Sequence, residues 1–332
     1  MCGWTGRVVL VYGLLVLVAV LGFEGIRRWE GYRVNELMCM QGDTSSPSHG
    51  VASAYNPFPS RCEWNQALLS PSQVTLKYHC DLDSCDTLNM DQQTANWIGS
   101  ALQQRRSALA TEQSHLISRL PSSNQYVAKA LFDSPQLHML SSNQWRSFLT
   151  YETASLFGPN WTALDVGGGN GDVTKHFSSM YGELWMADVS PLISARQRLN
   201  GFRNTIVSYT VTEDLLAGYS VPDIDIVFLL NVIDQLEDPA AYLRQLVRSF
   251  SMQRKPPLLV LSVPLPWNAW QSRHRFPVNG TTWEASTTSL QSLLLQVGLR
   301  TLKLTRAPYL CQGTYQVPLF VLDSALFILS ST

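Results

Sequence analysis

One stretch near the middle of the chain organises the sequence: Leu164-Asp165-Val166-Gly167-Gly168-Gly169-Asn170-Gly171-Asp172. The apolar residues that lead into it are typical of a buried β-strand. The glycines suit a tight turn in which the backbone approaches a ligand closely. A helix predicted over 171–181 would then direct its first free N–H groups at the same ligand. The stretch therefore predicts a strand, a glycine-rich loop and a helix that bind a small molecule.

The spacing of the glycines separates two kinds of ligand. Dinucleotide enzymes carry G-x-G-x-x-G, but here Asp172 occupies the place of the last glycine counted from Gly167. Asp165 precedes the loop, where a carboxylate would repel a pyrophosphate and favour a cationic methionyl group. The D-x-G-x-G-x-G order therefore favours a ligand with a sulfonium and an amino group. We expect the cofactor S-adenosyl-L-methionine, bound by Asp165, Gly167, Gly169 and Gly171. An ordinary tight turn is the alternative for the glycines alone.

A second acidic residue supports a nucleoside ligand. Asp188 follows the predicted strand Leu184–Ala187, and a carboxylate at this place can accept hydrogen bonds from both ribose hydroxyls. Dinucleotide enzymes share this feature, so Asp188 indicates a nucleoside in general. Asp165 is the residue that distinguishes the two ligands.

Strands and helices alternate from about residue 160 to the end of the chain, which predicts a doubly wound parallel sheet with an antiparallel edge. The expected strands are Ala163–Val166, Leu184–Ala187, Thr205–Tyr209, Ile224–Leu230, Leu258–Val263, 299–306 and 318–329, and the expected helices are 171–181, 191–199, 238–251 and 284–297. Before them we expect helices over 88–120, 126–131 and 142–149. The predicted organisation is a signal peptide or anchor (1–27), a flexible linker (28–75), a helical N-terminal module (76–150) and a catalytic domain (151–331).

Composition limits the kinds of partner molecule and the cellular compartment that we expect for the protein. With 24 basic and 25 acidic side chains the net charge is −1, which argues against DNA or RNA as the main partner. The apolar run from Val8 to Phe23 is interpreted as a cleaved signal or an uncleaved anchor that associates with the membrane, with a buried core helix as the alternative. We therefore expect the endoplasmic reticulum or another secretory compartment. Cys80 and Cys85 are close enough for a local disulfide there. The cysteine spacing does not support a metal site.

Three segments carry a resemblance to a known family. They are the glycine-rich stretch through Thr174, the run Phe228-Leu229-Leu230-Asn231-Val232-Ile233-Asp234-Gln235-Leu236-Glu237-Asp238-Pro239, and the run Thr305-Arg306-Ala307-Pro308-Tyr309-Leu310-Cys311-Gln312-Gly313. Together they resemble the DREV family of methyltransferases, and the likeness extends from Tyr78 to Leu329. Gly280-Thr281-Thr282-Trp283-Glu284 and Val321-Leu322-Asp323-Ser324-Ala325-Leu326-Phe327 also match in place. Glu213 remains from the family's Asn-Glu-Trp at the adenine, whereas the segment between Trp267 and Trp283 looks shorter than in the relatives.

The resemblance implies a substrate and roles for several residues. It implies methylation of a protein histidine at Nδ1 in His-x-His sequences, with Asn231 and Asp234 lining the substrate site and Tyr309 holding the imidazole. A carboxylate that accepts the Nε2 proton would leave Nδ1 free to attack, and Asp234 is the candidate for this role. Asn231 would orient the ring or the cofactor's amino group, and Glu213 would contact the adenine. A turn or helix cap is the alternative for Asn231 and Asp234, and a core aromatic for Tyr309.

The sequence thus predicts an α/β fold: a Rossmann-like, seven-stranded class I S-adenosylmethionine-dependent methyltransferase fold with a helical N-terminal module. The expected reaction is methylation of a histidine-containing protein or peptide. Methylation of a small molecule or of another protein side chain is the second hypothesis. A catalytically silent cofactor-binding module is the third.

Overall fold

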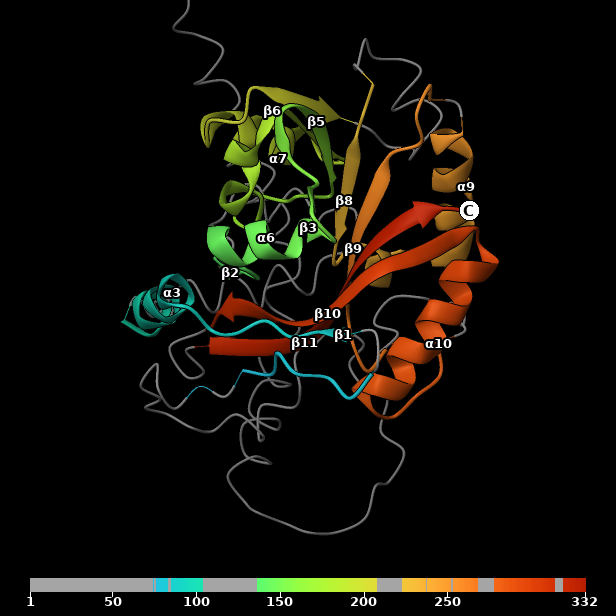
Figure 1. Cartoon of the computed structure of the whole chain (residues 1–332). Coiled ribbons are helices and arrows are strands. Elements are labelled where there is room, and N and C mark those ends of the chain that lie inside the picture. Colours follow the sequence, from blue (N-terminus) through green and yellow to red (C-terminus); the bar gives the residue numbers. More distant parts are fainter. Residues whose placement is uncertain are drawn as a thin grey trace, which may run out of the picture. The chain divides into compact units, whose positions relative to one another are not determined.

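The computed structural model describes residues 74, 76–82, 85–103, 136–207, 223–236, 238–251, 253–267, 278–313 and 319–332, which all belong to one compact unit. At its centre lies a nine-stranded sheet with the order β1-β10-β11-β9-β8-β5-β6-β7, in which β2 also pairs with β10 (Figure 1). The strands are β1 (Cys85–Asp86), β2 (Leu137–His138), β5 (Gly158–Val166), β6 (Tyr181–Asp188), β7 (Asn204–Val207), β8 (Ile226–Leu230), β9 (Leu258–Pro264), β10 (Leu299–Gln312) and β11 (Leu319–Ser331).

Strand directions confirm the predicted doubly wound sheet. The neighbours β7, β6, β5, β8 and β9 run parallel, while β11 is antiparallel to both β9 and β10. The chain leaves β5 toward β6 and β7, and then returns to add β8 on the other side of β5. Ligands of open α/β sheets bind at such a reversal, outside the carboxyl ends of the strands. This edge of the sheet is where the glycine-rich stretch and Asn231 lie.

Capping side chains set the helix boundaries. Helix α7 (Pro191–Leu199) begins after Ser190, α9 (Pro239–Phe250) after Asp238 and α10 (Trp283–Gln296) after Thr282, and each cap accepts a hydrogen bond from the first turn. The predictions 191–199, 238–251 and 284–297 are confirmed to within one residue. The predicted helix 171–181 is wrong: two short 3₁₀ helices, η3 (Thr174–His176) and η4 (Ser178–Met180), replace it.

Two apolar layers enclose the sheet. On one face, α9 and α10 contribute Leu243, Phe250 and Leu290 to a cluster with the inward side chains of the central strands (Figure 1). On the other face, α6 (Ser142–Phe148) contributes Trp145, whose ring contacts Phe177 at a centroid distance of 5.0 Å. The central strands are apolar on both faces because both are covered, as expected for parallel strands.

The segment before residue 150 is joined to the edge of the sheet. β1 runs parallel to β10 at Leu304 and Thr305, and β2 runs antiparallel to β10 at Leu310 and Cys311. Cys80 and Cys85 form the disulfide considered from the sequence. Helix α3 (Gln92–Gln103) packs Ile98 and Ala101 against Leu310 and Leu319. Residues 104–135, which include the predicted helix 126–131, lie outside the described residues.

Two buried histidines connect this segment to the loop after β5. His138 Nδ1 lies 3.2 Å from His176 Nε2, and His138 Nε2 lies 3.3 Å from Thr94 Oγ1. Trp97 stacks on the His138 ring at a centroid distance of 5.2 Å. Burial lowers the pKa of His138 to about 3 and that of His176 to about 4. His176 also lowers the pKa of His138, Lys175 lowers both pKa values, and Asp91 raises both. Both rings are therefore neutral in the folded chain at physiological pH.

This pair predicts a loss of stability in acid. Each unfolded imidazole binds a proton near pH 6.5, whereas the folded ones do not until about pH 4 or 3. The stabilisation is thus fully present above pH 6.5 and falls by about 1.4 kcal/mol per pH unit and per histidine below it. Between pH 7 and pH 5, the free energy of unfolding of His138→Asn or His176→Asn should fall by about 2 kcal/mol less than that of wild type. Urea unfolding at the two pH values measures it.

Replacing an exposed histidine is the matched control for this comparison. The His79 side chain is 73% exposed, so His79→Asn should keep the wild-type pH dependence. Equal pH dependence in the His138→Asn and wild-type chains would contradict the assignment.

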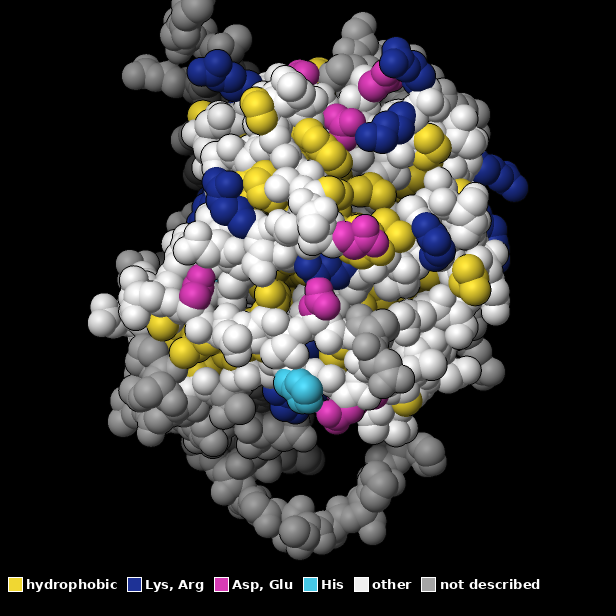
Figure 2. Space-filling model, in the orientation of Figure 1, with side chains coloured by type: hydrophobic (Ala, Val, Ile, Leu, Met, Phe, Trp, Pro, Cys, Tyr) yellow, Lys and Arg dark blue, Asp and Glu magenta, His cyan; other side chains and the backbone are white. Residues whose placement is uncertain are grey.

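Charged side chains are scattered singly over the face seen in Figure 2, without a continuous basic or acidic patch. In the described part of the chain, no helix is both long and apolar enough to cross a membrane. The apolar run at residues 8–23 lies outside that part.

Candidate active site

The glycine-rich loop is shaped by three left-handed residues. Gly167, Gly169 and Gly171 have φ values of +74°, +54° and +82°, a region that glycine adopts without a steric penalty. The Gly167 N–H donates to the Ala187 carbonyl at 2.8 Å, which fixes the start of the loop to β6. A Cβ on Gly168 would overlap the Asp165 carboxylate. A Cβ on Gly169 would meet no atom of the described residues within 4 Å, so these residues leave open space there.

Asp165 lies near the end of β5, just before the loop. It is 1% exposed, and its Oδ2 accepts a hydrogen bond of 2.5 Å from Thr174 Oγ1. Its Oδ1 is buried and has no hydrogen-bond partner among the described residues. Burial raises the pKa of Asp165 to about 7, the Thr174 hydroxyl lowers it and the Asp188 charge raises it. A carboxylate with an unused buried oxygen is suited to a cationic ligand group.

Asp188 approaches the loop from the end of β6. Burial raises its pKa to about 6, and hydrogen bonds from the backbone N–H groups of Ser190, Val189 and Gly169 oppose the rise. The Ser190 N–H lies 2.9 Å from Oδ1. On the other side of the loop, Gln197 Nε2 donates to the Gly169 carbonyl at 2.8 Å. Asp165 and Asp188 therefore both lie against the glycine-rich loop, as the cofactor prediction requires.

Asn231 occupies a strained position at the end of β8. Its φ is +54°, a left-handed conformation that asparagine tolerates better than most residues do. Its N–H donates to the Ser262 carbonyl at 3.0 Å, and its Oδ1 accepts from Ser262 Oγ at 2.5 Å. Its side chain lies near enough to the Tyr309 hydroxyl to lower the pKa of that group. The structure thus brings Asn231 and Tyr309 together from strands that are distant in sequence.

Asp234 lies one turn further along, in the 3₁₀ helix η5 (Ile233–Gln235). Its Oδ1 is buried without a hydrogen-bond partner in the described part of the chain, and burial raises its pKa to about 6. Burial also raises the pKa of Tyr309, and the charges of Asp234 and Asp172 raise it further. The site therefore combines a neutral phenol with carboxylates that are only partly compensated.

Sequence reasoning missed some contributors and named one that the described residues do not include. Ser262 was not singled out, because it is a lone polar residue in an apolar strand. Asp172 and Thr174 were quoted only as part of the motif. Glu213 lies outside the described residues, so its expected adenine contact stays a prediction. Among the described residues, no group of three histidine, cysteine or acidic side chains could bind a metal ion.

The other quoted segments meet at Arg306. This buried guanidinium contacts Glu284 Oε1 at 3.1 Å and Asp323 Oδ2 at 3.0 Å, and it lies over the Trp283 ring at 4.8 Å. These contacts join α10 and β11 to β10 close to Tyr309. The segments around 283 and 323 therefore support the strand that carries Tyr309.

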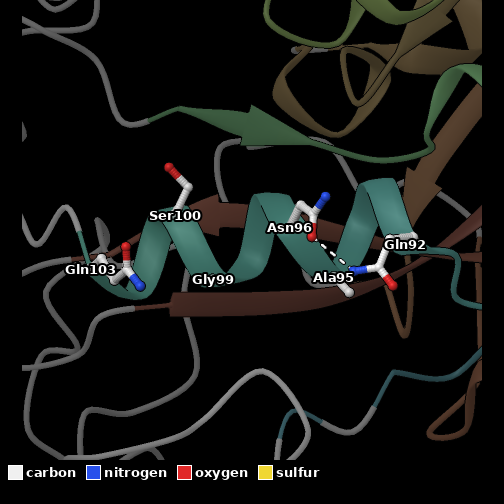
Figure 3. A pocket seen from close by; sticks show the side chains of 6 residues that line it. All are labelled: Gln92, Ala95, Asn96, Gly99, Ser100 and Gln103. Atoms are coloured by element: carbon white, nitrogen blue, oxygen red, sulfur yellow. Dashed lines mark hydrogen bonds between the residues drawn. The ribbon is translucent and has the colours of Figure 1, made fainter.

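A hollow along α3 provides no competing active site. Figure 3 shows its lining of small and amide side chains, with a hydrogen bond of 2.8 Å from Gln92 Nε2 to Asn96 Oδ1. Its described lining residues carry no titratable group, and they are Gln92, Ala95, Asn96, Gly99, Ser100 and Gln103.

Comparison with known proteins agrees with this arrangement. The model of the DREV methyltransferase family matches residues 84–331, about three quarters of the chain. The chain belongs to the DREV methyltransferase family. In this DREV methyltransferase, the glycine-rich stretch, Asn231, Asp234 and Tyr309 lie toward the carboxyl ends of the parallel strands.

Solved methyltransferase structures are similar at low identity. Magnesium protoporphyrin IX methyltransferase (ChlM) from Synechocystis PCC 6803, with bound S-adenosylhomocysteine, is 12% identical at a TM-score of 0.38, with 68% of this DREV methyltransferase and 95% of that chain covered. The N-methyltransferase NodS from Bradyrhizobium japonicum WM9, in complex with S-adenosyl-L-homocysteine, is 17% identical at a TM-score of 0.33, with 52% of this chain and 78% of that chain covered.

Proposed function

We propose that this methyltransferase transfers a methyl group to the Nδ1 atom of a histidine in a protein or peptide, in His-x-His-type sequences. The observation that carries the proposal is the buried Asp234 Oδ1 atom, which has no partner among the described residues and belongs to the same cluster as Tyr309 and Asn231. An imidazole offers this oxygen the Nε2–H donor that it lacks. The resemblance of the Asn231 and Tyr309 segments to the histidine-modifying family gives the same assignment.

S-adenosyl-L-methionine is the methyl donor, as the sequence predicts. The loop fits it: Asp165 offers an unused buried oxygen to a cationic methionyl group, and Gly169 borders the open space. In our proposal Asp188 accepts hydrogen bonds from the ribose hydroxyls, and Glu213 contacts the adenine. When bound, the cofactor supplies a methyl group on a positively charged sulfur.

The side chains of the site orient the acceptor imidazole and stabilise the positive charge that forms on it. Asp234 accepts a hydrogen bond from the Nε2–H group, so that Nδ1 carries the lone pair that attacks the methyl carbon. With the cofactor bound, the bond from Nδ1 to carbon would form as the bond from sulfur to carbon breaks, which would leave a neutral thioether. The Asp234 carboxylate stabilises the positive charge that forms on the imidazole and then takes the Nε2 proton. Positioning and electrostatics provide most of the rate in such a displacement.

We also propose that the protein acts in the endoplasmic reticulum or another secretory compartment. The Cys80–Cys85 disulfide supports this location, because disulfides persist in oxidising compartments. The run at 8–23 would direct the chain there and would associate it with the membrane if it stays uncleaved. In this proposal the partners are histidine-containing proteins or peptides, and nucleic acids are not partners.

Methyl transfer from labelled S-adenosylmethionine tests the substrate. The purified chain is incubated with a peptide that carries several His-x-His units, and with the same peptide in which alanine replaces every histidine. Label on the first peptide alone supports histidine methylation. If neither peptide is labelled although calorimetry detects cofactor binding, the acceptor is a small molecule or another side chain, and the proposed substrate is wrong. Absence of methyl transfer to any acceptor would favour the silent module.

A further inference from the structure

Thr174 and Gly168 occupy one oxygen of the Asp165 carboxylate. Thr174 and Asp165 are each 1% exposed, and Thr174 Oγ1 donates to Asp165 Oδ2 at 2.5 Å. A Cβ built on Gly168 would overlap the same oxygen, so the loop backbone passes close to it. Asp165 Oδ1 is buried and has no hydrogen-bond partner among the described residues. Oδ1 is therefore the oxygen that a ligand can use.

Contacts on both sides of Thr174 hold it in place. Before it, the Gly171 N–H donates to the Gly168 carbonyl at 2.9 Å, which closes the turn of the loop. After it, His176 Nε2 lies 3.2 Å from His138 Nδ1, which joins η3 to β2. The hydroxyl of Thr174 is therefore directed at the carboxylate by the fold of the chain itself.

The Thr174 hydroxyl also favours the charged form of the carboxylate. Burial raises the pKa of Asp165 to about 7, and the hydrogen bond from Thr174 lowers it. An ionised carboxylate accepts a charge-assisted hydrogen bond from an ammonium group, whereas a protonated carboxyl group provides no charge to pair with it. Thr174 thus affects which oxygen of Asp165 faces a ligand and also the charge which that oxygen carries.

We propose that Thr174 is a positioning residue that determines specificity for the cofactor: its hydroxyl holds Asp165 Oδ2, and thereby presents Oδ1 to the amino group of the methionyl part. The inference rests on the proposed contact between Asp165 and the cofactor, and it is independent of the methyl acceptor. Without the hydroxyl, both oxygens would be buried without a donor from the described residues. The carboxyl group would then be protonated more readily, and ligands with an amino group would lose their advantage.

Calorimetric titration with two ligands tests the inference. The full chain is titrated with S-adenosylhomocysteine and with its analogue in which hydrogen replaces the amino group. Wild type should bind S-adenosylhomocysteine at least about ten-fold more tightly than the analogue. Thr174→Val keeps the shape of the side chain and removes the donor. It should weaken S-adenosylhomocysteine by about ten-fold and the analogue by less than about two-fold. A wild-type ratio of the two Kd values in Thr174→Val would overturn the inference.

Two further variants separate the hydrogen bond from packing. Thr287 is fully buried in α10, and its Oγ1 donates to the Trp283 carbonyl at 2.7 Å. Thr287→Val removes the same group away from the loop, so both Kd values should stay at the wild-type level. Thr174→Ser keeps the hydroxyl and should keep the wild-type ratio. Equal changes in Thr174→Val and Thr287→Val, or the Thr174→Val ratio in Thr174→Ser, would overturn the inference.

The titrations contain no methyl acceptor, so they do not depend on the proposed histidine substrate. If the histidine peptide is not methylated while Thr174→Val loses the ratio, the proposed substrate is wrong and the inference is supported. If wild type binds both ligands equally well, Asp165 does not contact the amino group, and the inference is overturned with that contact. Because both ligands are titrated into the same variant, a general loss of folded protein affects both Kd values alike.

Discussion

Asp234→Asn is expected to lower kcat for methyl transfer by about 10²- to 10⁴-fold while the cofactor Kd stays near the wild-type value. Asparagine keeps the shape of the side chain, but its amide neither takes a proton nor compensates the positive charge that develops on the imidazole. Because the Asp234 Oδ1 atom is buried without a partner among the described residues, the neutral side chain should not destabilise the fold. Labelled methyl transfer gives kcat, and calorimetry gives the cofactor Kd.

An exposed carboxylate serves as the control for Asp234. Asp223 is exposed shortly before β8, so Asp223→Asn removes the same charge without touching the site. Its kcat should equal that of wild type. If Asp234→Asn keeps kcat within about two-fold of wild type, Asp234 is neither the proton acceptor nor the group that stabilises the imidazolium.

Gly169→Leu should weaken cofactor binding by at least about a hundred-fold, which corresponds to about 2.7 kcal/mol. A side chain at Gly169 would project into space in which no atom of the described part of the chain lies within 4 Å of the new Cβ. The Gly169 N–H also contacts Asp188, the proposed ribose acceptor, so the leucine would take up room beside the expected cofactor site. Calorimetric titration with S-adenosyl-L-methionine measures the loss of affinity.

Gly201→Leu separates this exclusion from backbone strain. Gly201 also has a positive φ, +95°, and a Cβ there would likewise meet no described atom within 4 Å. Both substitutions force a left-handed conformation on leucine and should lower the free energy of unfolding by about 1–2 kcal/mol. Only Gly169→Leu should reduce cofactor affinity. Equal affinities in the two variants would show that the open space at Gly169 is not the cofactor site.

Local signals made most of the fold predictable. Ser190 followed by Pro191 marks the start of α7, and the structure places the helix at the predicted residues. The same kind of signal failed over 171–181. There the Thr174 hydroxyl binds the Asp165 carboxylate and the backbone forms turns of three residues, from His176 to Val173 and from Phe177 to Thr174. A tertiary contact thus changed a local conformation that periodicity described as a helix.

The site residues that lie in a recognisable sequence motif were predictable. The structure brings Asn231, Asp234 and Tyr309 together, while the roles given to them stay predictions. Ser262 escaped notice because its contact with Asn231 joins two strands through side chains, which no spacing records. The pair His138 and His176 escaped for the same reason, since their contact spans 38 positions. The strands β1 and β2 are two residues long, too short for any alternation to appear.

The pairing of β1 and β2 with β10 has a consequence for biosynthesis. Thr305 Oγ1 binds the Asp86 carbonyl across 219 positions, so the partner of β1 leaves the ribosome long after β1 itself. At translation rates of about 5–20 residues per second, this delay is on the order of ten to forty seconds. Throughout it, the apolar side chains of α3 that later pack against Leu310 and Leu319 have no place to bind. We therefore expect the nascent N-terminal half to depend on chaperones until the last strands emerge.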